Sequence, residues 1–180
     1  VVSMKGFFTG FYNDFVANAK VSTNLGSLNS DLTLRKQKGD RRIGYNGKLG
    51  VQSFDIGKLT GNEEMIGAVS LSANLDGQGL NLADADLRFT TLIDSIYLNR
   101  YCYRNIDLKG KLTEKKFDGA VLVRDPNLNL DFNGIVDLSD TLPEFDFKAR
   151  IREAQLYRLH LLERDTITHL ATTINSDFTG

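Results

Sequence analysis

Hydrophobic and polar residues alternate one by one along most of the chain, most regularly between residues 127 and 139. The apolar side of that segment is formed by Leu128, Leu130, Phe132, Gly134, Val136 and Leu138. Asparagine, aspartate and serine residues occupy most of the other side. Because a period of two places alternate side chains on opposite faces of a β-strand, the segment predicts a strand with one apolar and one polar face. Its length of roughly 36 Å is greater than that of an average strand.

The same alternation recurs before and after this segment. We expect further strands at residues 15–23, 28–35, 42–52, 67–75, 85–93, 106–112, 117–123, 145–152 and 169–178. Residues 1–12 predict one short strand, and residues 96–104 fit a strand in either of two registers. Short turn signals separate the strands, such as those at 38–40, 76–79 and 125–127. The sequence therefore predicts an all-β fold of about ten to twelve antiparallel strands with little helix.

Two stretches lose the period of two. Phe54, Ile56 and Leu59 fit neither a strand nor a full helix, and we expect a short turn or a single helical turn that ends at Gly61. The second irregular stretch covers residues 153–165.

The pattern is loosely duplicated along the chain. Residues 42–49 resemble 129–136, residues 54–59 resemble 154–159, and residues 71–77 resemble 174–180, in the same order. Any two alternating strands look alike, but three ordered matches favour true repetition. We expect a single repeat-built β domain over residues 1–180, with two modules at about 14–80 and 84–180. Because a repeat-built sheet has no natural end and the chain starts at Val1, we also expect it to be excised from a longer protein.

Glycines interrupt the apolar side in the middle of strands, at Gly47, Gly67, Gly110 and Gly134. An Asn-Gly pair ordinarily indicates a hairpin turn, but the alternation continues in phase through 46–47 and 133–134, which argues against a turn there. A glycine inside a strand marks a bend or the close approach of another group. Sheet curvature and room for a ligand on the apolar face are both compatible with these positions.

Composition and motifs argue against several classes of function. The net charge of −1 and the pI near 6.2 argue against binding to nucleic acid. The single cysteine, Cys102, excludes an internal disulfide, and no Cys/His set has zinc spacing. Neither His160 nor His169 accompanies a Gly-x-Ser-x-Gly motif. Residues 76–79 lack the further acidic ligands of a calcium loop. We therefore expect no catalytic residues, no metal site and no cofactor.

A large apolar face has to be covered, since soluble proteins rarely expose contiguous apolar patches above a few hundred Å². The sheet could close as a dry sandwich, close as a barrel around a small ligand, or bend into a U-shaped trough that is lined by lipid acyl chains. The inward positions mix Leu, Val and Phe with Gly, Ala, Ser and Thr. This mixture favours a wider lumen over a tightly packed sandwich.

Three segments of the sequence resemble those of a known protein family. Asp125-Pro126-Asn127-Leu128-x-Leu130, followed by Gly134 and Asp137-Leu138, resembles a recurring unit of TamB in the AsmA-like superfamily of Gram-negative envelope proteins. Gly26-x-Leu28-x-x-Asp31-Leu32-x-Leu34 and Phe54-Asp55-Ile56-Gly57-Lys58-Leu59 resemble other parts of that pattern. The resemblance covers most of residues 25–180 and is closest to the TamB-like proteins of Bacteroidetes.

The resemblance implies a fold and a setting. TamB-like proteins are anchored in the inner membrane, span the periplasm and consist of long β-taco troughs with an apolar interior. They are implicated in outer-membrane protein assembly with a TamA-type barrel partner and in phospholipid movement between membranes. This chain would be an internal fragment, so the anchor and the barrel partner belong to the parent protein.

The first hypothesis is a non-enzymatic periplasmic lipid conduit whose transported ligand is the phospholipid acyl chain. The side chains expected to line its groove are Leu32, Leu34, Ile43, Tyr45, Leu49, Val51, Val69, Leu71, Leu87, Phe89, Ile106, Leu108, Leu128, Leu130, Phe132, Val136, Phe145, Phe147 and Ile151. A second hypothesis is a scaffold whose exposed strand edges capture client strands by β-augmentation. Open edges also predict edge-to-edge self-association of the fragment. A third is a closed β-sandwich for adhesion or carbohydrate binding, which the absence of Trp makes less favourable.

Overall fold

The computed structural model describes residues 2–11, 14–36, 42–79, 81–162 and 169–179. These residues form eleven strands and one short helix, in this order: β1 (Val2–Phe11), β2 (Asp14–Thr23), β3 (Gly26–Lys36), β4 (Ile43–Asp55), α1 (Ile56–Thr60), β5 (Ile66–Gln78), β6 (Asp86–Leu98), β7 (Tyr101–Thr113), β8 (Lys116–Asp125), β9 (Leu128–Asp137), β10 (Glu144–Ala154) and β11 (Leu170–Thr179). The all-β prediction is confirmed, and the number of strands lies within the predicted range.

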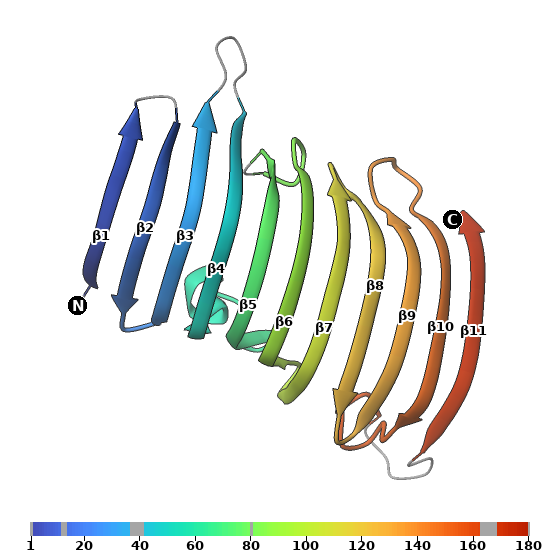
Figure 1. The fold of residues 1–180 in the computed structure, drawn as a ribbon. Helices are drawn as coiled ribbons and strands as arrows, with labels where there is room; N and C mark the ends of the chain where they lie inside the picture. The colour runs from blue at the N-terminus through green and yellow to red at the C-terminus, as the bar shows by residue number, and fades with distance from the viewer. Residues whose placement is uncertain (1, 12–13, 37–41, 80, 163–168, 180) are drawn as a thin grey trace.

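The strands make one sheet in which each strand pairs with its neighbours in sequence (Figure 1). All of these pairings are antiparallel. The order runs from β1 to β11 without a crossover, and β1 and β11 are the two edges of an open sheet. A closed sandwich would need a second sheet, and the described residues form only this one, so that alternative is wrong for the fold.

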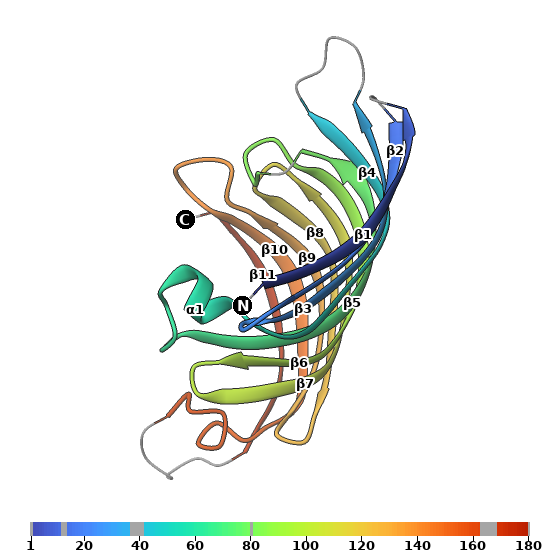
Figure 2. The same cartoon turned by 90° about the vertical axis from the view of Figure 1, so that its left-hand side faces the viewer.

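The sheet is bowed, with one concave and one convex face (Figure 2). Pairing irregularities lie at a similar level across it: between Val51 and Phe54 in β4, between Ser70 and Leu71 in β5, and after Ile151 in β10. Because β-bulges bend strands and increase their twist, this line of irregularities helps to curve the lower ends of the strands toward the concave side. The full U-shape of a β-taco remains a prediction.

A related irregularity explains why residues 96–104 fit two registers. Ile93 pairs with Ile106 and Ser95 pairs with Arg104, while the residues between them drop out of the pairing. Asn105, one of these, has a left-handed φ of 52°. The alternation therefore shifts by one residue at this level, and Tyr101 and Tyr103 continue the apolar face that the even-numbered residues of β7 form above it.

The predicted helical turn that ends at Gly61 is confirmed. Asp55 caps α1: its carboxylate accepts a hydrogen bond of 3.0 Å from Lys58 N–H and lies 2.8 Å from Lys58 Nζ. Gly61 ends the helix with a φ of 70° and donates its backbone N–H to Gly57. A carboxylate at the N-cap and a left-handed glycine after the last turn are the usual helix start and stop signals.

Of the three matches between similar segments, two join equivalent positions in the structure and one does not. The second and third matches place β4, α1 and β5 in correspondence with β10, residues 155–162 and β11, and in both units a bulge precedes the irregular connection. The first match instead aligns β4 with β9. These two strands run in opposite directions in the antiparallel sheet, so they do not occupy equivalent positions.

Candidate functional site

The apolar side chains of successive strands align into four rows that cross the sheet. The rows are numbered from the upper to the lower strand ends in Figure 1, and each is given from β3 to β11. The first row contains Leu34, Tyr45, Gly77, Leu87, Leu112, Phe117, Val136, Phe145 and Phe178, and the second contains Leu32, Gly47, Leu75, Phe89, Gly110, Gly119, Gly134, Phe147 and Ser176. The third row contains Ser30, Leu49, Ala73, Thr91, Leu108, Val121, Phe132, Ala149 and Ile174, and the fourth contains Leu28, Val51, Leu71, Ile93, Ile106, Val123, Leu130, Ile151 and Thr172.

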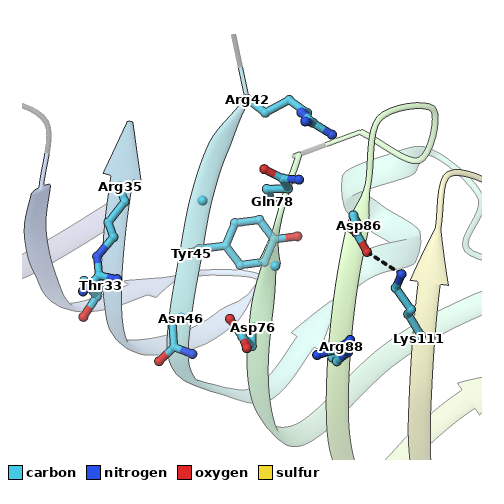
Figure 3. Close-up of a pocket in the computed structure, with 12 residues that line it drawn as sticks. Thr33, Arg35, Arg42, Tyr45, Asn46, Asp76, Gln78, Asp86, Arg88 and Lys111 are labelled. Atoms are coloured by element: carbon cyan, nitrogen blue, oxygen red, sulfur yellow. Dashed lines mark ion pairs between the residues drawn. The ribbon is translucent and has the colours of Figure 1, made fainter. Parts of the chain in front are cut away.

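The four rows line the concave face. Figure 2 shows that the viewer of Figure 1 looks onto the convex side of the sheet. Figure 3 shows β3 to β7 in the same left-to-right order as Figure 1, with the polar side chains toward the viewer, so the polar face is the convex one. The side chains that the sequence predicts to line a groove all lie on these rows, except Ile43, Val69 and Leu128. Alternation, corrected for the bulges, places these three on the same face beyond the rows.

Sequence reasoning missed further members of the same surface. Leu75, Ile93, Leu112, Phe117, Val121 and Val123 lie on the rows as well. Their alternation was the signal that could have found them. Most row residues are half-buried, whereas Val69 and Val123 near the lower end are 3% and 5% exposed.

The groove-facing glycines are explained by the backbone. Gly47 and Gly134 have φ values of 142° and 156°. A Cβ atom at Gly47 would lie 2.1 Å from Asp31 O, and one at Gly134 would lie 2.3 Å from Asp146 O. The space that a side chain would need is therefore filled by the neighbouring strand, which favours sheet curvature over room for a ligand at both positions.

Aromatic rings lie over the other glycines of the second row. Gly110 pairs with Gly119, and a Cβ at either position would lie 2.9 Å from the ring of Phe117. The rings of Phe89 and Phe117 are 6.2 Å apart. An aromatic side chain that covers a cross-strand glycine restores apolar contact that the glycine lacks. Phe117, with Phe89 beside it, therefore supplies the apolar surface that these two glycines lack.

Gly67 does not belong with the groove glycines. It lies in the irregular pairing between Ile66 and Val69, and a Cβ there would lie 3.0 Å from Cβ of Tyr97. Tyr97 follows Ile96, which pairs with Val69 on the concave side, so Tyr97 lies on the opposite face. The extra residue at this bulge reverses the face that plain alternation predicts.

Two connections lie on the concave side at its lower end. One is α1 (Figure 2). The other is residues 155–162, which we call the strap. Its Gln155 N–H donates a hydrogen bond of 2.9 Å to Asn127 O, and Asn99 Nδ2 donates one of 3.1 Å to His160 O. The strap therefore reaches back from β10 past the β8–β9 turn to the β6–β7 turn, and its Leu159 is fully buried.

A polar cluster lies beside the strap. Asp125 is 7% exposed and accepts hydrogen bonds from the hydroxyl group of Tyr101 and from the backbone N–H groups of Arg104 and Asn127. Burial, together with this hydrogen bond to Asp125, raises the pKa of Tyr101 to about 12. A buried carboxylate with three donors is a satisfied structural group.

The convex face is charged. It holds a cavity of about 340 Å³ whose lining includes Arg35, Arg42, Asp76, Arg88 and Lys111 (Figure 3). Lys111 Nζ lies 3.0 Å from Oδ1 of Asp86. Lower on this face, Arg124 and Arg152 each form an ion pair of 2.5 Å with Asp131, and these partners lower the pKa of Asp131. Paired charges of this kind are expected on a solvated face.

Within the described residues, no group of three or more His, Cys, Asp or Glu side chains is arranged to hold a metal ion. His160 lies in the strap and His169 lies just before β11. Cys102 is half-buried and free.

None of the helical residues that the structure describes forms a helix long and apolar enough to cross a membrane.

Comparison of the chain with protein-family models, with curated proteins and with solved structures gave no match.

Proposed function

We propose that this chain is a non-enzymatic lipid-binding segment whose concave face carries phospholipid acyl chains. The observation that carries the proposal is the continuity of the four apolar rows across the open sheet. Burying such a surface against acyl chains would contribute roughly 25 cal/mol per Å². This attraction is non-directional, so a chain could slide along the rows without breaking specific bonds.

The orientation of the rows supports a conduit rather than a closed pocket. Each row runs perpendicular to the strands, from one sheet edge toward the other. An acyl chain that lies along a row therefore meets apolar side chains of one strand after another. Lipid headgroups would stay at the open side of the groove, in water.

The wider setting follows from the resemblance to TamB. We propose that the parent protein is anchored in the inner membrane of a Gram-negative bacterium and spans the periplasm. There it would support phospholipid transport to the outer membrane and, with a TamA-type barrel, protein assembly in that membrane.

The proposal is tested by native mass spectrometry with lipid extraction on protein purified without detergent. We expect co-purified phospholipid in repeatable stoichiometry. Leu130→Asp should abolish it, because the carboxylate would stand unpaired among acyl chains. The matched control is Leu92→Asp, since Leu92 is 45% exposed and pairs with Ser72 and Asp107 on the convex face. A folded Leu130→Asp variant that retains the native amount of lipid would contradict the proposal.

A second candidate is a scaffold that captures client strands by β-augmentation. The observation in its favour is that β1 and β11, each ten residues long, pair on one side only. Their free backbone groups could bind an extended peptide, or a second copy of the chain. Photocrosslinkers at edge positions that capture unfolded outer-membrane strands but no lipid would favour this function over the conduit.

A further inference from the structure

The strap and the β6–β7 turn together line an open cavity of about 850 Å³ at the lower end of the sheet. Its lining is Asn99, Arg100, Tyr157, Arg158, His160, Leu161 and Leu162. Three of these side chains are apolar or aromatic and widely exposed: Tyr157 is 47%, Leu161 55% and Leu162 40% exposed. Exposed apolar groups that gather around one cavity indicate a binding site more strongly than the same groups scattered over a surface.

The charge of this cavity is one-sided. Arg100 and Arg158 line it, and no carboxylate is among the described residues of the lining. Within the part of the chain that the structure describes, neither arginine forms an ion pair. By contrast, Arg124 and Arg152 on the convex face share Asp131. The cavity therefore offers two guanidinium groups to an anion from outside the chain.

The two arginines are also held by ordered backbone. Asn99 and Arg100 have φ values of 46° and 65°, which fits a two-residue hairpin turn with a fixed geometry. His160 Nδ1 lies 3.3 Å from Asn99 O, and Asn99 Nδ2 donates to His160 O. These contacts fix the strap, with Arg158, against the turn that carries Arg100.

We propose that this cavity binds the phosphate group of a phospholipid with a net negative headgroup, and that Leu161 and Leu162 contact the adjoining part of its acyl chains. Guanidinium groups form strong, charge-assisted hydrogen bonds to phosphate. The positive charge favours an anionic headgroup over a zwitterionic one. This inference rests on the proposed function, because it makes the cavity the headgroup site at the lower mouth of the concave face.

The test uses a short-chain lipid below its micelle concentration. Calorimetry with the whole chain should show that dihexanoylphosphatidylglycerol binds about tenfold more tightly than dihexanoylphosphatidylcholine. The variant Arg100→Gln/Arg158→Gln should lose this preference while still co-purifying with long-chain lipid. Arg88→Gln is the control, because Arg88 lies on the convex face at the opposite end of β6 and should leave the preference unchanged.

Several results would overturn the inference. If the double arginine variant keeps the native preference while Leu130→Asp loses lipid, the conduit stands and the headgroup site is wrong. If inorganic phosphate alone binds as tightly as the short-chain lipid, the cavity is a simple anion site. If the protein sediments with phosphatidylglycerol vesicles but binds no monomeric lipid, the arginines dock a membrane surface instead. If neither the short-chain lipid nor co-purified lipid is found, both the inference and the proposed function fail.

Discussion

The hydroxyl group of Tyr101 donates a hydrogen bond of 2.5 Å to Oδ1 of Asp125. Tyr101 opens β7 and Asp125 closes β8, so the bond joins the lower ends of two paired strands. Asn127 Nδ2 donates in turn to the Tyr101 oxygen over 2.9 Å, and Asn127 O accepts from the strap. One polar network therefore connects the β8–β9 turn, the apolar face and the strap.

Removing the tyrosine hydroxyl should destabilise this end of the sheet. Tyr101→Phe leaves one donor fewer for the buried carboxylate and no acceptor for Asn127 Nδ2, and we expect a loss of about 1–3 kcal/mol in the free energy of unfolding. Urea unfolding followed by circular dichroism measures it. Tyr97→Phe is the control, because Tyr97 is 48% exposed. Equal midpoints for Tyr101→Phe and the native protein would show that the network does not stabilise the fold.

The raised pKa of Tyr101 predicts a loss of stability at alkaline pH. Burial and the hydrogen bond to Asp125 raise its pKa from the ordinary tyrosine value of 10.0 to about 12, so the folded state holds the proton more tightly than the unfolded chain does. The stability that this provides is fully present below pH 10 and is lost as the pH rises toward 12. Urea midpoints measured from pH 8 upward should decrease as the pH rises from 10 toward 12, and this decrease should be smaller in Tyr101→Phe. A decrease of the same size in the variant would assign it to other groups.

The second-row glycines should not tolerate even a methyl group. Gly134→Ala would place Cβ 2.3 Å from Asp146 O at a φ of 156°, and we expect a loss of more than about 1 kcal/mol in the free energy of unfolding. Gly50→Ala is the matched control within a strand, because the nearest atom there is 3.8 Å from the new Cβ. Thermal melts of both variants separate them. A Gly134→Ala variant as stable as Gly50→Ala would mean that the strand relaxes freely.

The strands could be predicted from sequence because the sheet is built from local pairings. Each strand pairs with its neighbour in sequence, so the turn signals and the period of two carry nearly all the information that the topology needs. The helical turn at α1 was predictable for the same reason, since Asp55 and Gly61 act within a few residues.

The structural features that could not be predicted from the sequence depend on β-bulges or on contacts between residues far apart in the chain. Nothing local marks Gly67 as lying on the face of Tyr97, because the extra residue at the β5 bulge shows only in the pairing with β6. Asn99 and His160 are 61 residues apart, so the strap looked irregular in sequence although it is fixed in space. The cavity with Arg100 and Arg158 is lined by residues from both sides of this long-range contact.

The strap should depend on one side chain. Leu159 is 0% exposed, and Leu159→Ala should cost about 2–5 kcal/mol by leaving a cavity beneath the strap. Leu161→Ala, two residues on and 55% exposed, should cost less than about 0.5 kcal/mol.

Hydrogen exchange of the backbone N–H groups of Leu159 and Leu161, which donate to Gln155 O and Leu156 O, reports local opening. We expect faster exchange in Leu159→Ala alone, with β3–β5 unchanged, because a strap that contacts the sheet at the β8–β9 and β6–β7 turns can open without unfolding the strands. Loss of protection throughout the sheet would instead make Leu159 part of a single cooperative core.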